Sequence, residues 1–440
     1  MKTYITVLSA MFLLATGASA QRTTGQIVSD AADQLRYQAS RIPEDGKFPR
    51  TLVTDYSIPE VAYHLERAPK DFYPETGMAK HPSVKDFSTV AYVNYHDWTS
   101  GFYPGSLWLA YEMTGNEDLR DLAAKYTNQL LPVSRKKDTH DLGFMVNCSY
   151  GNALRLAPDD SIKNVIVATA DNLIGRFDPK VGLIRSWDWG KWNYPVIIDN
   201  MMNLQLLFNA SKLTGDPKYR DIAVKHADKT MRNHFRSDYS SYHVVSYTPD
   251  GRVESRGTYQ GKSHDSAWSR GQAWGLYGYT ECYRETGEKR YLDQARNIAS
   301  LIMRKNEAPD RVPYWDLDAR TAPDSPRDAS AGAICASALI ELSTFVPEWE
   351  GKIYRDYAMQ ILDALSSDKY TAPKCANGGF ILMHSTGSMP QGSEIDTPLN
   401  YADYYYLESL ARLKRIQDGK TPGDWDRIAG KKIRKSKKSK

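Results

Sequence analysis

Cysteine is scarce in this sequence, with 4 among 440 residues. The four lie far apart, which excludes a disulfide-rich scaffold and leaves no pair at the spacing that zinc sites use. Three of them stand in apolar stretches of helical periodicity, so we expect small buried hydrophobic side chains there. The cysteines are Cys148, Cys282, Cys335 and Cys375.

Long apolar runs are missing beyond the first 20 residues, which excludes a membrane span in the rest of the chain. The 9 histidines show no paired spacing of the kind that zinc enzymes use, so we expect neither a metal nor another cofactor. No shift of composition marks a linker between residues 21 and 430. We therefore predict a single domain over 21–430.

Residues 1–20 have the pattern of a secretion signal. Lys2 gives the positive start, residues 7–14 the apolar core, and Ala18-Ser19-Ala20 a small-residue cleavage site. No cysteine lies near that site, which argues against a lipid anchor. We expect an exported protein, periplasmic or extracellular.

The basic residues in excess are concentrated at one end. The formal net charge is +4, yet residues 431–440 alone carry seven positive charges. Without that tail and Lys2 the chain is net acidic, so its basic character does not indicate a nucleic-acid-binding domain. We expect the tail to be a disordered, solvated end.

Aromatic residues are abundant, with 10 Trp and 29 Tyr. Trp187, Trp189 and Trp192 fall within six residues, and Asp199 follows just before an apolar helical run. Aromatic faces stack on sugar rings, and a carboxylate beside them can perform acid–base chemistry on glycosides. We interpret Asp199-Asn200 as a helix N-terminus beside a sugar-binding wall. The alternative is an ordinary helix cap beside a core of tryptophans.

A repeated motif divides the chain into helical pairs. A glycine is followed four residues later by Leu or Tyr at Thr114-Gly115, Thr214-Gly215 and Thr286-Gly287, and a looser copy stands at Glu350-Gly351. We expect one helix to end at each glycine and an amphipathic helix to begin a few residues later.

The helices before these joints are apolar nearly all round, whereas those after them carry many charges. Six of each kind predict an all-α fold, the (α/α)6 barrel, a toroid of six helical hairpins. The predicted inner helices are 105–113, 143–156, 199–213, 271–284, 329–345 and 401–413. The predicted outer helices are 26–42, 117–131, 161–175, 217–233, 289–304 and 352–366.

The loops that lead into the inner helices hold the unusual polar residues, and all six should meet at one end of the toroid. Helix caps would explain some of their aspartates. They do not explain the histidines and aromatic residues that arrive with them, which favour an active site. The residues in question include His140, Asp141, Asp199, Arg270, Asp328 and Asp403.

Seven motifs, in order over residues 90–415, resemble the unsaturated glucuronyl hydrolases, glycoside hydrolase family 88. They are Trp-Thr-Ser-Gly-Phe at 98–102, His-Asp-Leu-Gly-Phe at 140–144, Asp-Asn-Met-Met-Asn at 199–203, Ser-Ala-Trp-Ser-Arg-Gly-Gln-Ala-Trp at 266–274, Arg-Asp-Ala-Ser-Ala at 327–331, His-Ser-Thr-Gly-Ser at 384–388 and Asn-Tyr-Ala-Asp-Tyr-Tyr at 400–405.

The resemblance implies an (α/α)6 enzyme that removes the 4,5-unsaturated glucuronic acid left at the non-reducing end of oligosaccharides by polysaccharide lyases. Such enzymes hydrate the C4=C5 double bond. By this resemblance Asp199 is the general acid and base, and Asp141 the second carboxylate. Ser385 and Ser388 bind the uronate carboxylate. The residues expected to hold the sugar are His140, Trp98, Trp187, Trp189, Gln272 and Arg270.

Three alternatives remain open. An unsaturated rhamnogalacturonyl hydrolase would share the fold and reaction but act on pectin fragments, and the His-Asp-Leu-Gly-Phe motif favours the glucuronyl group. A polysaccharide lyase would create the ultraviolet absorbance of the double bond, which a hydrolase destroys. A non-catalytic glycan-binding protein would not need the paired Asp141 and Asp199. The sequence does not name the parent polymer, since glycosaminoglycan, ulvan, xanthan and gellan fragments all end in this sugar.

Overall fold

The computed structural model describes residues 22–53, 78–80, 89–319 and 325–423. The predicted signal segment 1–20 and the basic tail 431–440 lie outside these ranges. Within the described residues, no helix has the length and apolar character that crossing a membrane requires.

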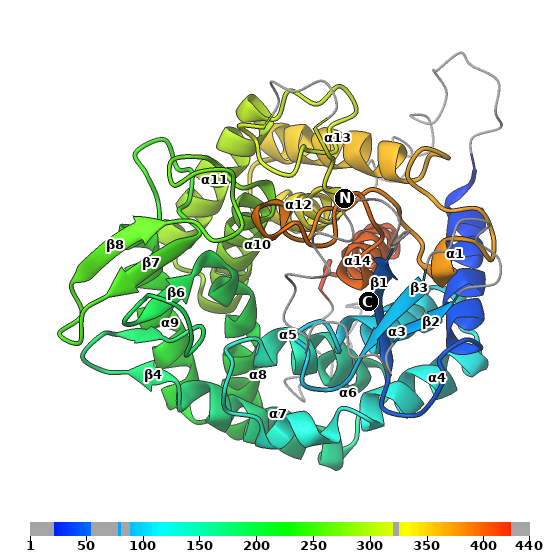
Figure 1. The fold of residues 1–440 in the computed structure, drawn as a ribbon, viewed down its shortest axis with the longest axis horizontal. Helices are drawn as coiled ribbons and strands as arrows, with labels where there is room; N and C mark the ends of the chain where they lie inside the picture. Colours follow the sequence, from blue (N-terminus) through cyan, green and yellow to red (C-terminus); the bar gives the residue numbers. More distant parts are fainter. Residues whose placement is uncertain (1–21, 54–77, 81–88, 320–324, 424–440) are drawn as a thin grey trace, which may run out of the picture.

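In the described ranges, twelve helical segments form two concentric rings (Figure 1), which confirms the predicted (α/α)6 toroid. The inner segment α14 packs against the inner helix α3, which closes the ring. The outer helices are α1 (Thr24–Ala39), α4 (Glu117–Asn128), α7 (Asp160–Ile174), α9 (Pro217–Asn233), α11 (Lys289–Lys305) and α13 (Glu348–Leu365). The inner segments are α3 (Phe102–Thr114), α5 to α6 (Leu142–Val146, a π-helical turn Asn147–Gly151, and Asn152–Leu156), α8 (Leu204–Thr214), α10 (Ser269–Thr286), α12 (Ala329–Leu342) and α14 (Asn400–Gln417).

Small residues let the inner helices press against the turn that carries Asp199. A methyl group on Gly143 of α5 would lie 2.5 Å from the Cα atom of Asn203, and one on Gly278 of α10 would lie 2.5 Å from the Cβ atom of Met201. Both distances are far below van der Waals contact, so only glycine allows this approach. The turn is thereby held between two inner helices.

Three of the four predicted joints are confirmed. Gly115, Gly215 and Gly287 end α3, α8 and α10 in the left-handed conformation that suits glycine. The fourth is wrong, because α13 already begins at Glu348 and Gly351 lies inside its first turns. Its role is close packing, since a methyl group there would lie 2.5 Å from the carbonyl oxygen of Ser343.

The glycine joints lie at one rim of the toroid, and the start of α1 and the end of α14 meet at the same rim. One groove there is lined by residues of α1, of the α3–α4 turn and of the end of α14, including Thr24, Asn116 and Gln417. The opposite rim carries all six loops that lead into the inner helices.

Short strands, which the sequence did not predict, lie in the loops of this second rim (Figure 1). Strands of two to six residues are too short for their side-chain alternation to stand out among helices. One antiparallel sheet has the order β1 (Phe48–Val53), β3 (Thr89–Val93), β2 (Met78–Lys80). A second pairs β4 (Phe177–Asp178) with β5 (Leu183–Ile184), and a third has the order β6 (Pro195–Ile197), β7 (Val244–Tyr247), β8 (Val253–Gly257).

The core of the toroid is apolar near the outer ring, and it includes Cys148, Cys282 and Cys335 as expected. Between α10, α12 and α14 it also holds buried charges. Arg284 donates to Glu341 at 2.6 Å, and Arg412 lies 2.6 Å from the other oxygen of Glu341. Glu281 is equally buried. Arg284 lies 3.8 Å from its Oε1 atom and favours the anion, but neither carboxyl oxygen has a hydrogen-bond partner, and burial raises the pKa of Glu281 well above the ordinary value.

Glu281→Gln should therefore stabilise the protein in alkaline solution. The folded chain keeps the Glu281 proton at pH values where the unfolded chain, with an ordinary pKa of 4.5, releases it. The free energy of unfolding that depends on Glu281 thus falls as the pH rises above that value, and glutamine removes this fall. Urea unfolding from about pH 4 to pH 9 measures the effect. Glu285→Gln, which breaks contacts to Arg284 and Lys212, should instead destabilise the fold; equal pH slopes for wild type and Glu281→Gln would refute the assignment.

Candidate active site

Asp199 lies in a 3-10 turn, Ile198–Asn203, that precedes α8. A helical segment does begin at Ile198, next to the predicted N-terminus at Asp199-Asn200, but its first part is a 3-10 turn with Ile197 at the cap position, and α8 itself begins only at Leu204. The carboxyl group of Asp199 is buried, and its Oδ2 atom has no hydrogen-bond partner. One oxygen of this carboxyl group is therefore not hydrogen-bonded within the part of the protein that the structure describes.

Burial raises the pKa of Asp199 to about 7. Arg270, the amide of Asp199 itself and the indole of Trp274 favour the anion, whereas the charge of Asp141 favours the proton. A carboxyl group with this pKa both gives and accepts a proton near neutral pH, which is what general acid–base catalysis needs. The direction agrees with the predicted role of Asp199.

Asp141 stands at the start of α5 in a more open setting. Its Oδ2 atom accepts a hydrogen bond from the Thr139 hydroxyl at 2.8 Å, and its Oδ1 atom lies 3.2 Å from Nε2 of His140. Burial lowers the pKa of His140, so the ring is neutral near pH 7. His140 thus lies beside Asp141, and the charge of Asp141 acts on Asp199.

His243, at the head of β7, also lies at this site and was missed from the sequence. Its Nδ1 atom accepts the backbone N–H groups of Tyr259 and Gln260, both at 3.1 Å. Burial, together with Arg270 and His140, lowers its pKa to about 3, so the ring is neutral and its proton sits on Nε2. That atom lies 3.6 Å from Oδ2 of Asp199. A lone histidine before a short strand forms no motif, so only the contact with Asp199 reveals it.

An aromatic cluster extends from His243 towards solvent. Trp187 stacks on Trp189, with ring centres 4.6 Å apart and an interplanar angle of 14°. Trp192 and Tyr259 meet these rings edge-on or tilted, and Trp187 lies edge-on to His243 at 6.5 Å. Trp189 is 52% exposed and marks the outer end. The rings thus gather as the sequence predicted, and their contact with a sugar stays a prediction.

Trp98 belongs to a separate aromatic cluster at the same rim. It packs against Phe102, Phe144 and Tyr401, with ring centres 5.0 to 5.7 Å apart. The guanidinium of Arg270 lies over the Tyr401 ring at 5.5 Å. Trp98 therefore stands among core aromatics that border the site, and its contact with a sugar stays a prediction.

Arg270 donates to three acceptors of the protein itself. It is buried and donates to Asp328 at 2.8 Å, to the carbonyl of Thr386 at 2.6 Å and to the carbonyl of Gly387. It thereby ties the start of α10 to the start of α12 and to the loop that carries Ser385 and Ser388. The predicted direct contact of Arg270 with a uronate has no support in these bonds.

Gln272, like Arg270, makes its hydrogen bonds to other groups of the protein. Its Oε1 atom accepts the N–H of Ser241 at 2.8 Å, and its Nε2 atom donates to the Ser241 hydroxyl at 3.0 Å and to the Trp268 carbonyl at 3.2 Å. The side chain is buried. A contact of Gln272 with the sugar stays a prediction that these bonds do not support.

The loop with Ser385 and Ser388 forms a narrow hairpin. The backbone of Ser385 pairs with Thr397 and that of Ser388 with Ser393. The Ser385 hydroxyl is buried without a partner, whereas the Ser388 hydroxyl donates to Gln391. Gln391 in turn donates to the carbonyl of Tyr259 at 2.8 Å, so the hairpin reaches the aromatic cluster.

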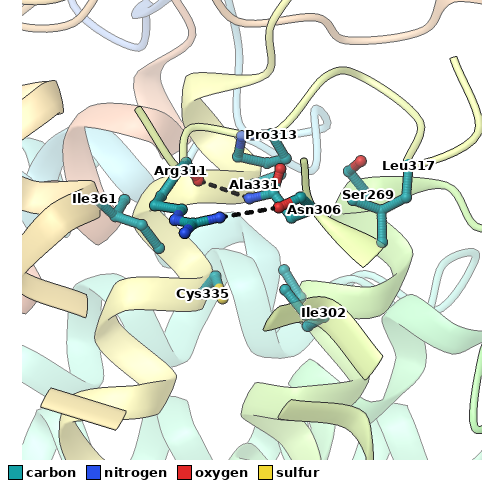
Figure 2. A pocket seen from close by; sticks show the side chains of 10 residues that line it. Ser269, Ile302, Asn306, Arg311, Pro313, Leu317, Ala331, Cys335 and Ile361 are labelled. Carbon is teal, nitrogen blue, oxygen red and sulfur yellow. Dashed lines mark hydrogen bonds between the residues drawn. The ribbon is translucent and has the colours of Figure 1, made fainter. Parts of the chain in front are cut away.

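A small cavity between α10, α11, α12 and α13 is separate from these residues (Figure 2). Its volume of about 10 Å³ fits about one water molecule and no sugar. Asn306 and Arg311 close it with two hydrogen bonds, of 2.8 and 3.3 Å. It contains neither aspartate and has no part in the site.

The sequence matches the model of a known family of enzymes. The family model described as Glycosyl Hydrolase Family 88 matches residues 74–368, more than half of the chain. The chain belongs to this family. The family 88 motifs recognised in the sequence thus led to the right assignment.

Relatives within family 88 are similar over most of their length. An unsaturated glucuronyl hydrolase of Formosa agariphila is 47% identical over 325 residues, which are 73% of this chain and 80% of the relative. An unsaturated chondroitin disaccharide hydrolase of Streptococcus pneumoniae is 36% identical over 72% of this chain and 81% of its own. The crystal structure of an unsaturated glucuronyl hydrolase specific for heparin has a TM-score of 0.80 at 44% identity, covering 90% of this chain and 98% of that one.

The titratable side chains of the site are carboxyl and imidazole groups. In the part of this family 88 chain that the structure describes, no group of three or more His, Cys, Asp and Glu side chains is arranged to hold an ion. The site consists of two carboxyl groups, two neutral histidines and aromatic rings. Such a set is suited to proton transfer on a sugar.

Proposed function

We propose that this family 88 enzyme removes 4,5-unsaturated glucuronic acid from the non-reducing end of lyase-generated oligosaccharides by hydrating the C4=C5 bond. The observation that carries the proposal is the carboxyl group of Asp199, buried without a partner on Oδ2 and with a pKa of about 7. The similarity to unsaturated glucuronyl hydrolases supports the same reaction.

The reaction then follows from the contacts of Asp199. Its carboxyl proton is transferred to C4, and water adds to C5, where positive charge develops. The carboxylate of Asp199 takes the proton of that water and is ready for the next cycle. The resulting hemiketal at C5 opens and releases the remaining oligosaccharide, so that the net change is the addition of one water.

Each of the two protonation states of Asp199 is favoured by a different neighbour. Nε2–H of His243, 3.6 Å from Oδ2, stabilises the Asp199 carboxylate that forms when C4 is protonated. The charge of Asp141 acts in the opposite direction and restores the proton to Asp199. Asp199 is therefore balanced between its two forms, which suits a group that must serve as acid and base in turn.

For the substrate, we propose unsaturated disaccharides derived from glycosaminoglycans. Relatives carry names that refer to chondroitin disaccharide and heparin, and the cluster of Trp187, Trp189, Trp192 and Tyr259 offers rings for the neighbouring sugar. A panel of unsaturated disaccharides that differ in linkage and sulfation tests this proposal. Loss of the double-bond absorbance identifies the hydrolase and its best substrate. Activity confined to rhamnogalacturonan or ulvan fragments, or a rise in absorbance on intact polymer, would overturn the proposal.

We also propose that the enzyme is exported and that its leader is removed after Ala20, on the strength of the Ala18-Ser19-Ala20 site. The mass of the mature protein from the native cell tests this. A mass that includes Met1 would contradict it.

Ser388→Ala should raise KM on the best disaccharide while leaving kcat nearly unchanged. The Ser388 hydroxyl donates to Gln391 in the structure, and in the proposed complex it donates to the uronate carboxylate in its place. A lost hydrogen bond to a charged group costs roughly 1.5–3 kcal/mol of binding. Initial rates over a range of substrate concentrations give both constants. Ser393→Ala, in the same hairpin, is the matched control. An unchanged KM in Ser388→Ala would remove the hairpin from carboxylate recognition.

A further inference from the structure

Ser186 lies directly between the two loops that carry the aspartates. Its carbonyl accepts the N–H of His140 at 3.2 Å, and its hydroxyl accepts the N–H of Ile197 at 3.0 Å. His140 precedes Asp141, and Ile197 stands two residues before Asp199. The side chain of Ser186 is buried, and its own N–H donates to the Pro195 carbonyl at 2.9 Å. One residue thus accepts a backbone N–H group from each of the two aspartate loops, one with its carbonyl and one with its side-chain hydroxyl.

Ile184, two residues earlier in β5, extends this connection. Its carbonyl accepts the side-chain amide of Asn200, the residue after Asp199, at 2.8 Å. Its N–H donates to Nδ1 of His226 at 3.0 Å. His226 comes from the outer helix α9 and is buried, and burial lowers its pKa to about 3, so Nδ1 remains an acceptor. The segment 184–186 is therefore anchored to the outer ring on one side and to the Asp199 turn on the other.

The two hydrogen bonds of Ser186 fix the separation of the loops that carry Asp141 and Asp199. The Coulomb interaction of two carboxyl groups varies inversely with their separation, and Asp141 is one cause of the high pKa of Asp199. The water that adds at C5 must also fit between fixed groups, and a displacement of about 1 Å at an active site can reduce a rate by about 100-fold.

We propose that Ser186 is a positioning residue of the hydration reaction, which holds the loops of Asp141 and Asp199 at a fixed separation. The proposal rests on the proposed function. Ser186 does not touch the reacting atoms. It acts through His140 on one side and through Ile197 on the other, and it also sets the start of the aromatic segment, since Trp187 follows it directly.

The test compares Ser186→Ala with Ser246→Ala. Both serines are buried. Ser246 lies in β7 opposite Pro195, and its hydroxyl donates to Glu254 at 2.8 Å, away from the aspartates. In Ser186→Ala we expect kcat to fall about 10-fold to 100-fold with KM nearly unchanged. The alkaline limb of the pH–rate profile should also move to lower pH, because a loosened Asp199 turn admits water. Ser246→Ala should keep the kcat and the pH profile of the wild type.

A double variant separates positioning from a general loss of structure. If Ser186 acts through Asp199, adding Ser186→Ala to Asp199→Asn should reduce the residual rate by less than about 2-fold, because the group being positioned is already gone. A full additional loss in the double variant, or equal kcat and pH profiles for Ser186→Ala and Ser246→Ala, would overturn the inference. A wild-type enzyme inactive on the whole disaccharide panel would instead refute the proposed function, which keeps the two failures distinct.

Discussion

Asp199→Asn should fold, bind the best unsaturated disaccharide and lose activity by a factor on the order of 10²–10⁴. Asparagine has the shape of the protonated aspartic acid, and the Oδ2 atom it replaces has no hydrogen-bond partner to lose. It cannot give a proton to C4 or take one from water. Rates measured as loss of the double-bond absorbance, with binding measured by calorimetry, give both parts of the prediction. Near-normal kcat would remove Asp199 from the mechanism.

The activity of the wild type should depend on pH through the protonation of Asp199. Asp199 must be protonated to act on C4, so kcat/KM should fall as the pH rises through about 7. The folded state also holds this proton above the ordinary pKa of 3.8, so the free energy of unfolding declines between that value and about 7. Asp199→Asn should therefore be more stable than the wild type in alkaline solution while nearly inactive.

Asp403 provides the control for this reasoning. Burial raises its pKa to about 7 as well, but its two oxygens accept the N–H groups of Ile381 and Leu382 at 2.9 and 2.8 Å. Asp403→Asn leaves one of these donors without its acceptor and should cost about 1–3 kcal/mol of unfolding free energy. The folded fraction should keep its kcat. A raised pKa thus identifies a catalytic group only where no partner already uses the oxygens.

Arg270→Met should lower the free energy of unfolding by about 3–5 kcal/mol. The substitution leaves the carboxylate of Asp328 buried without its cation and frees the carbonyls of Thr386 and Gly387. Urea unfolding at pH 7 measures the loss. Arg252→Met is the matched control, because its ion pair with Asp250 is on the surface and should contribute less than about 1 kcal/mol.

The activity of Arg270→Met, measured under conditions in which it stays folded, should fall through a higher KM. The loop that carries Ser385 and Ser388 loses the guanidinium that fixes it, so its groups no longer converge on the substrate. A variant as stable as the wild type would show that the Arg270–Asp328 pair is not what holds this part of the toroid.

The sequence predicted the helices well because their signals are long and redundant. Apolar periodicity, glycine joints and charged outer faces all agree over α8 and α9, so an error at one residue changes little. The strands gave no such signal, and Gly351 matched the joint motif although packing, and not a helix end, explains it.

The site was predicted less completely, since side-chain partners depend on distant segments. The sequence singled out Asp199 as a candidate catalytic group, but it did not predict the 3-10 turn, because a short polar residue before an apolar run normally caps an α-helix. The bonds of Arg270 and Gln272 to Thr386 and Ser241 join residues that are 116 and 31 positions apart. His243 depends on Tyr259 and Gln260 for its orientation, and no local pattern announces such a contact.

The two rims of the toroid have different consequences for chain order. The rim of Gly115, Gly215 and Gly287 only returns the chain from an inner helix to an outer one, and α14 ends beside the start of α1 at this same rim. A connection from α14 to α1 would therefore resemble the other turns there. The chain could start at any of the hairpins without moving a loop of the site, since these loops all lie at the other rim. The arrangement of the loops around the site therefore does not depend on which hairpin comes first in the chain.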